Sequence, residues 1–170
     1  MGVEIERKFL VVGDAWRAQA ARAQRMVQGY LIDADQVLRA AARCSVRVRL
    51  ADDVAWLNIK SATLGVSRQE YEYEIPTSDG KHMLRDLCNG VIDKTRHYVA
   101  CDGVLFEVDE FHGENAGLIV AELELEAEDQ PFPRPAWLGA EVSTASRYYN
   151  IHLIHHPYSR WSADEKTGVA

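Results

Sequence analysis

The stretch VEIERKFLV, Val3 to Val11, determines how the rest of the chain is interpreted. Successive side chains of a β-strand point to opposite faces, so Glu4, Glu6 and Lys8 share one face of the expected strand. Apolar residues and one arginine occupy the other face, at Val3, Ile5, Arg7 and Phe9. Charges on one face of a single strand usually meet solvent. The same alternation recurs along most of the chain, and that recurrence needs its own explanation.

Six further segments carry charged or polar side chains two residues apart. They are Arg47 with Arg49, Asn58 with Lys60, Glu70 with Glu72 and Glu74, Lys94 with Arg96, Glu107 with Asp109, and Glu122 with Glu124 and Glu126. A solvated strand face usually carries a mixture of polar residue types. Here whole strands carry one sign, and like charges two residues apart repel each other. The pattern therefore indicates a ligand that offers negative groups to the basic strands and a cation to the acidic ones.

The composition bounds the class of protein. The chain has 170 residues, 47% hydrophobic and 26% charged, which is typical of one ordinary globular domain. We place that domain at residues 1–156 and expect a mobile tail at residues 157–170. The net charge of −7 argues against nucleic acid as the main partner. We see no secretory signal and no apolar run long enough for a membrane span, so we expect no membrane partner.

The three cysteines support a reducing compartment. Cys44, Cys88 and Cys101 are odd in number, and none of them forms a CxxC pair. Reduced thiols are the default for such a chain, so the sequence predicts a cytoplasmic protein.

Strand patterns dominate the chain, with about eight strands and few helices, which favours an antiparallel barrel or sandwich. A short helix is expected from Asp14 to about Ala23, and a strand over Met26–Ile32 with a bulge at Gly29. Asp102-Gly103 predicts a hairpin turn. Two more helices are expected, one following Pro76 and ending near Asn89, and one over Ser146–His155.

A closed barrel of about eight strands can hold one small ligand. Turning the charged faces inward gives a tunnel lined by arginines, lysines and carboxylates. Arginine pairs with phosphate through two hydrogen bonds, whereas carboxylate and phosphate oxygens suit Mg²⁺ or Mn²⁺. The ligand implied by the residues is a metal-bound polyphosphate.

An ordered set of motifs resembles a known family. The segments are EIERKFL, QGYL, RVR, IKS, RQEYEYEI, KTRHYV, FEVDEF, GLIVAELEL, WLGAEV and RYYN, from about Val3 to Asn150. They resemble the CYTH superfamily, the triphosphate tunnel metalloenzymes, and most closely its compact bacterial inorganic tripolyphosphatases. The resemblance implies an eight-stranded antiparallel β-barrel with a few outer helices, mainly β in class, that encloses a charged tunnel.

The resemblance also implies roles for single residues. Metal ligands would be Glu4, Glu6, Asp109, Glu122 and Glu124, which would hold Mg²⁺ or Mn²⁺, with two ions expected. The triphosphate would be bound by Lys8, Arg47, Arg49, Lys60, Lys94, Arg96 and Arg147. Catalytic roles would fall to Lys8, Glu70, Glu72 and Lys94, with the two glutamates completing metal binding or positioning water. The sequence departs from the family pattern at Ser143 to Ser146.

The expected activity is metal-dependent hydrolysis of inorganic triphosphate to pyrophosphate and phosphate. Two enzyme alternatives share the tunnel, namely a class IV adenylyl cyclase and a thiamine triphosphatase. An alternative of a different class is a non-catalytic module that binds polyphosphate or a nucleotide. The expected partner is a small-molecule triphosphate, and a homodimer is left open.

Overall fold

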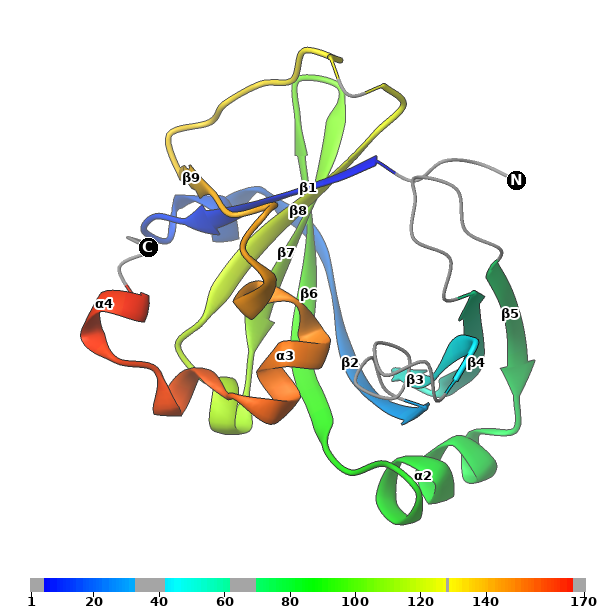
Figure 1. The fold of residues 1–170 in the computed structure, drawn as a ribbon. Coiled ribbons are helices and arrows are strands. Elements are labelled where there is room, and N and C mark those ends of the chain that lie inside the picture. The colour runs from blue at the N-terminus through cyan, green and yellow to red at the C-terminus, as the bar shows by residue number, and fades with distance from the viewer. Residues whose placement is uncertain (1–4, 33–41, 62–69, 128, 167–170) are drawn as a thin grey trace. The chain divides into compact units, whose positions relative to one another are not determined.

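The chain is described here by a computed structural model that covers residues 5–32, 42–61, 70–127 and 129–166. It divides into two compact units. Among the described residues, unit 1 comprises those from Arg25 to Asp93, and unit 2 comprises those from Ile5 to Gln24 and from Lys94 to Lys166. Each unit is described by itself, and two long strands, β2 and β6, contribute residues to both (Figure 1). No helix in the described ranges is long and apolar enough to cross a membrane.

Unit 1 contains a run of antiparallel strands. Their order is β5 (Glu70–Ile75), β4 (Val54–Ser61), β3 (Cys44–Ala51) and β2 (Ala20–Ile32). The turn between β3 and β4 contains Asp52 at a φ of 51°. This left-handed conformation is one that aspartate tolerates better than most residues. The register pairs Arg47 with Asn58 and Asn58 with Glu72, so polar side chains adjoin across three strands.

The helix α2 (Thr77–Asp86) covers the apolar face of β3 and β4. Gly80 lies so close to β4 that a Cβ atom there would be 2.6 Å from the Cβ of Ala55 and 3.9 Å from Val48. Both strand residues are buried. Since side chains alternate along a strand, Arg47 and Arg49 belong to the opposite face of β3. The side chains of α2 therefore cover only the apolar face of β3 and β4, and not the charged face that carries Arg47 and Arg49.

Unit 2 contains five neighbouring antiparallel strands (Figure 1). Their order is β6 (Val91–Cys101), β7 (Val104–Phe111), β8 (Ile119–Leu125), β1 (Ile5–Val11) and β9 (Leu138–Glu141). Asp102 and Gly103 join β6 to β7 at positive φ angles of 44° and 85°, so the hairpin prediction is confirmed. The core of this unit consists of Phe9, Trp16, Val99, Phe106, Val108, Ala121, Leu123, Leu125 and Trp137.

Several short helical segments lie between and after the strands of unit 2. They are η1 (Ala15–Gln19), η2 (Gly113–Asn115), η3 (Ser146–Tyr148), α3 (Asn150–His155), η4 (Tyr158–Arg160) and α4 (Ala163–Lys166). Residues 157–166 thus contain two short helices, and Trp161, which lies between them, is 5% exposed and packs on the ring of Tyr148. The domain boundary at residue 156 stays a prediction.

The prediction of a mainly β, antiparallel fold with a few helices is confirmed. The described strands number nine rather than eight, because the short β9 joins the edge of β1.

Two local predictions were wrong. The helix expected from Asp14 to Ala23 is only the short turn η1, and β2 already begins at Ala20. Gly29 pairs regularly with Val48, and the irregular register lies between Tyr30 and Ile32. Glycine is needed at position 29 for another reason, since a Cβ there would be 2.7 Å from the Sγ of Cys88.

The close approach of α2 to β4 yields a test. Replacing a glycine inside a helix by alanine usually stabilises it by about 1 kcal/mol. Gly80→Ala should instead lower the free energy of unfolding by about 1–3 kcal/mol, because its methyl group overlaps that of Ala55. Urea denaturation measures the change, with exposed Lys81→Ala on the same helix as the control. An increase in stability for Gly80→Ala would show that the helix does not pack as described.

Candidate active site

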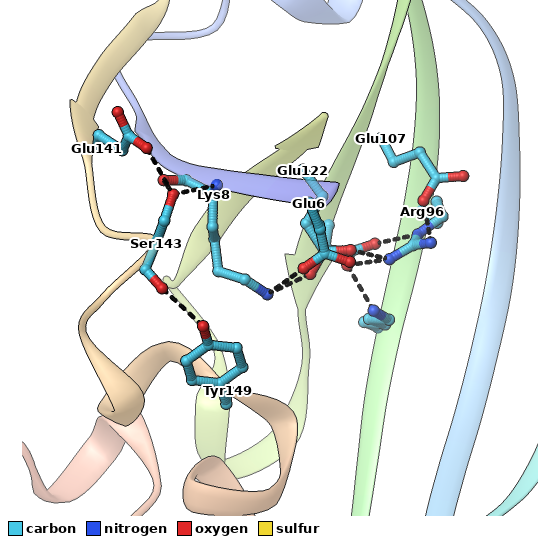
Figure 2. Close-up of polar contacts among 10 residues, drawn as sticks. Glu6, Lys8, Arg96, Glu107, Glu122, Glu141, Ser143 and Tyr149 are labelled. Carbon is cyan, nitrogen blue, oxygen red and sulfur yellow. Dashed lines mark hydrogen bonds and ion pairs between the residues drawn. The ribbon is translucent and has the colours of Figure 1, made fainter. Parts of the chain in front are cut away.

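The charged face of unit 2 centres on Lys8 of β1. The register places Lys8 directly opposite Glu122 of β8, and Glu6 opposite Glu124. The Lys8 ammonium forms an ion pair with Glu122 and lies 3.4 Å from a carboxylate oxygen of Glu6 (Figure 2). Burial alone would lower the pKa of Lys8, but the charges of Glu122 and Glu6 outweigh burial and raise it. Lys8 is therefore a buried ammonium at neutral pH.

Arg96 of β6 is held by three carboxylates. Its guanidinium donates to both oxygens of Asp109 at 2.7 Å, to Glu122 at 2.6 Å, and to Glu107. Burial alone would raise the pKa of Glu122, but Lys8 and the other nearby cations lower it well below its usual range. Burial dominates at Glu107 and raises its pKa. The arginine thus fixes acidic side chains from both β7 and β8 (Figure 2).

Lys94 is the most deeply buried cation of the face. Its side chain is 2% exposed, and its ammonium lies 2.5 Å from Asp109, which is 1% exposed. Burial, with repulsion from Arg96, lowers the pKa of Lys94. A buried charge costs several kcal/mol unless it is paired, so the Lys94–Asp109–Arg96 cluster must stay together for the strands to pack.

Glu6 and Glu124 carry the type of donor group that binds a divalent cation. Glu6 and Glu124 are cross-strand neighbours and are both exposed, and like charges directly opposite each other on a sheet repel. Partial desolvation by its neighbours and the charge of the nearby Glu122 raise the pKa of Glu6. A divalent cation would relieve this repulsion, and carboxylate oxygens are the donors that Mg²⁺ and Mn²⁺ prefer. Within the described ranges, however, no group of three or more acidic, histidine or cysteine side chains is gathered closely enough to hold a metal.

The charged face of unit 1 is organised by Asn58, which is 1% exposed. Its amide donates to Glu70 at 2.5 Å and to Glu72 at 3.2 Å. Lys60 lies 3.1 Å from Glu70, and Arg49 donates to Glu72 at 3.1 Å. Burial raises the pKa of Glu70, but the hydrogen bond from Asn58 and the charge of Lys60 outweigh it and lower the pKa. The four charged side chains of this set are more exposed than the buried Lys8, Glu122, Lys94 and Asp109 of unit 2, so solvent and ligands reach them more easily.

Arg147 is placed by aromatic residues of unit 2. Its Cζ lies 5.2 Å from the ring centroid of Tyr148 and 5.6 Å from that of Trp161. Its Nε is buried and has no hydrogen-bond partner among the described residues.

The structure brings the predicted residues together in two sets. Unit 2 gathers Glu6, Lys8, Lys94, Arg96, Asp109 and Glu122, with Glu124 beside them, and unit 1 gathers Arg49, Lys60, Glu70 and Glu72. Arg47 shares the face of Arg49 and faces Asn58 across the strands. Glu4 lies outside the described residues.

Four contributors were missed as site residues. Glu107 and Asn58 belong to the alternating pattern, and that pattern could have identified them. Ser143 and Tyr149 follow no such pattern, because their partner Lys8 lies about 140 residues earlier in the chain.

Comparison with known proteins places the chain in a family. The CYTH domain matches residues 2–155. An inorganic triphosphatase of Acetivibrio thermocellus is 43% identical over 163 residues, which covers 95% of this chain and 99% of that protein. An inorganic triphosphatase of Nitrosomonas europaea is 34% identical over 153 residues, covering 88% and 95% of the two chains. The chain belongs to the CYTH family.

Solved structures agree with this assignment. The crystal structure of the inorganic triphosphatase NE1496 has a TM-score of 0.67 at 32% identity, over 91% of this chain and 95% of that one. A structure of HpAC1 from Hippeastrum has a TM-score of 0.55 at 18% identity, over 73% and 80% of the two chains, and shares the fold alone.

The buried cluster leads to a stability prediction. Arg96→Met removes the guanidinium that neutralises Asp109 and Glu122, and breaking a buried ion pair costs about 3–5 kcal/mol. Arg25→Met removes an arginine with the same two-bonded geometry to Asp93, but Arg25 is 66% exposed, so about 0–1 kcal/mol is expected. Urea denaturation without metal compares the two. Equal losses would contradict the structural role of Arg96.

Proposed function

We propose that the protein is a divalent-metal-dependent hydrolase of inorganic triphosphate, which it converts with one water molecule to pyrophosphate and phosphate. The main structural support is a set of buried cations and carboxylates on neighbouring strands. They pair with each other around the Lys8–Glu122 ion pair and lie on the face opposite the apolar core. A relative 43% identical over 95% of the chain carries the name inorganic triphosphatase, and this supports the proposal.

Seven cations form the proposed phosphate-binding set. They are Lys8, Arg47, Arg49, Lys60, Lys94, Arg96 and Arg147. Arg147 suits this role because its Nε is buried with no described partner. Lys94 and Arg96 are fully engaged with carboxylates, so phosphate oxygens would have to replace carboxylate oxygens as their partners. Phosphoryl transfer depends mainly on positioning and charge neutralisation, which is what this set supplies.

The proposed metal ligands are Glu4, Glu6, Asp109, Glu122 and Glu124, with Mg²⁺ or Mn²⁺ as the cation and two ions in the full site. Glu6 and Glu124 are the exposed members of this set, so a cation reaches them most easily, and at Glu6 it would compete with the 3.4 Å ion pair to Lys8. When bound, divalent cations neutralise phosphate oxygens and favour attack by water.

The catalytic roles belong to Lys8, Glu70, Glu72 and Lys94. Lys8 is an ammonium at neutral pH and donates hydrogen bonds to the oxygens that gain charge as the phosphoanhydride bond breaks. Glu70, with its lowered pKa, is a carboxylate and can accept a hydrogen bond from the attacking water. Glu72 shares the Asn58 amide with Glu70 and would help to hold that water. Lys94 keeps Asp109 in place.

A cytoplasmic location is part of the proposal, because all three cysteines are free thiols. A homodimer stays a prediction.

A phosphate-release assay tests the proposed activity. With Mg²⁺ or Mn²⁺, tripolyphosphate should be hydrolysed far faster than ATP or thiamine triphosphate, and the rate should vanish with EDTA. Glu124→Gln should raise the metal concentration needed for half-maximal activity, whereas Lys60→Met should mainly raise KM for tripolyphosphate.

Each alternative has its own outcome in that assay. Formation of cyclic AMP from ATP at a rate comparable with tripolyphosphate hydrolysis would favour a cyclase. Faster cleavage of thiamine triphosphate than of tripolyphosphate would favour a thiamine triphosphatase. Tight tripolyphosphate binding without any turnover would favour a binding module. Each of these results would contradict the proposal.

A further inference from the structure

Tyr149 touches Lys8 although it belongs to none of the charged strands. It lies between η3 and α3, and the centroid of its ring is 5.2 Å from the Lys8 ammonium (Figure 2). An ammonium near an aromatic ring is attracted to it, more strongly when water is excluded. The Lys8 side chain is only 5% exposed, so this contact acts on a largely desolvated charge.

The same tyrosine is fixed through its hydroxyl group. Tyr149 donates a hydrogen bond of 2.6 Å to the backbone carbonyl of Ser143. The Ser143 hydroxyl accepts a hydrogen bond of 2.9 Å from the backbone N–H of Lys8 and donates one of 2.7 Å to Glu141. The backbone N–H of Val142 donates to the Lys8 carbonyl at 2.8 Å. The segment from Glu141 to Tyr149 is therefore attached to Lys8 at its backbone and touches its ammonium.

Glu141 attaches this segment to β1 a second time. It forms an ion pair with Arg7 through two hydrogen bonds on the face opposite Lys8. Arg7 in turn lies 4.7 Å from the ring centroid of Phe132. The chain after β8 thus contacts both faces of β1, at Arg7 on one face and at Lys8 on the other. These contacts fix the position of Tyr149.

The arrangement restricts where the ammonium can go. Lysine offers three N–H donors, and Glu122 and Glu6 are the carboxylates next to it. Without a ring beside it, a flexible lysine side chain could move toward either carboxylate or toward solvent. The ring of Tyr149 occupies one side of the ammonium and leaves a narrower range of positions.

We propose that Tyr149 is a positioning residue for Lys8. Its ring holds the ammonium beside Glu6 and Glu122, and its hydroxyl, through Ser143, holds the ring. The inference rests on the proposed function, in which Lys8 faces the reacting phosphate. It adds a residue that lies outside the alternating pattern and outside the proposed ligand sets.

Steady-state kinetics on tripolyphosphate at saturating metal test the proposal. Tyr149→Leu should lower kcat about tenfold with a smaller change in KM, because a misplaced ammonium affects the transition state more than binding. Tyr149→Phe keeps the ring and should stay within about threefold of wild type. Tyr98→Leu is the matched control, since Tyr98 also has a hydrogen-bonded hydroxyl, to Gln24, and a cation over its ring, from Arg22.

A double substitution separates positioning from packing. Adding Tyr149→Leu to Lys8→Met should change the remaining kcat little, because the group that it positions is already gone. A further tenfold loss in the double variant would mean that Tyr149 acts through packing and would overturn the proposal. So would a Tyr149→Leu enzyme with unchanged kcat.

A readout without turnover keeps this inference separate from the proposed activity. In protein with ¹³C-labelled lysine, the Lys8 ε-methylene signal, assigned by its loss in Lys8→Met, should show a ring-current shift. The shift should persist in Tyr149→Phe and disappear in Tyr149→Leu. If the wild type hydrolyses no tripolyphosphate, the proposed function fails, and this signal still decides the contact. An identical Lys8 signal in Tyr149→Leu and wild type would overturn the inference alone.

Discussion

The pairing of buried charges is the constraint on which the rest of the structure depends. Asp109 is 1% exposed and is neutralised by Lys94 and Arg96, which come from the neighbouring strand. Glu122 is neutralised by Lys8 from one side and Arg96 from the other. A register shift of one residue in β1, β6, β7 or β8 would move these ions into the apolar core, where each would cost several kcal/mol. The ion pairs and the core therefore specify the same strand alignment.

Charged groups in unit 1 are arranged differently. Lys60, Glu70 and Glu72 are about a quarter to two-fifths exposed, and their link is the buried amide of Asn58. An asparagine can hold two carboxylates without neutralising them, so they keep their negative charge. Unit 2 thus combines a buried, mutually paired cluster with exposed Glu6 and Glu124, whereas unit 1 offers more accessible charges held by one neutral side chain. The proposed chemistry needs both kinds of group, some to fix geometry and others to meet ligands.

Much of this could be predicted from the sequence, because alternation along a strand fixes which side chains share a face. Arg49 and Glu72, or Lys8 and Glu122, could be assigned to charged faces without knowing the fold. The cross-strand pairing partners could not be predicted, since the register depends on contacts between distant segments. The degree of burial could not be predicted either. Lys94 and Lys60 look alike in the sequence, but the Lys94 side chain is 2% exposed and that of Lys60 is 27% exposed.

Features that depend on single long-range contacts were missed for the same reason. The structure around η1 is set by Trp16, which is fully buried and packs against His97, whereas the alanines nearby suggested a longer helix. Tyr149 contacts Lys8 because β9 pairs with β1, and no local sequence pattern predicts that pairing. Tertiary packing outweighed local helix propensity at η1, whereas the Tyr149 contact joins segments that are far apart in the sequence.

The central claim is that the charged faces serve to bind a metal-bound triphosphate. Thermal unfolding with and without tripolyphosphate, with Ca²⁺ in place of Mg²⁺, measures this most directly. Ligand at about 100 times its Kd should stabilise the wild type by roughly 2.7 kcal/mol. Arg49→Met should lose most of that gain, and Arg25→Met should keep it. No stabilisation of the wild type, or equal stabilisation of wild type and Arg49→Met, would contradict the account.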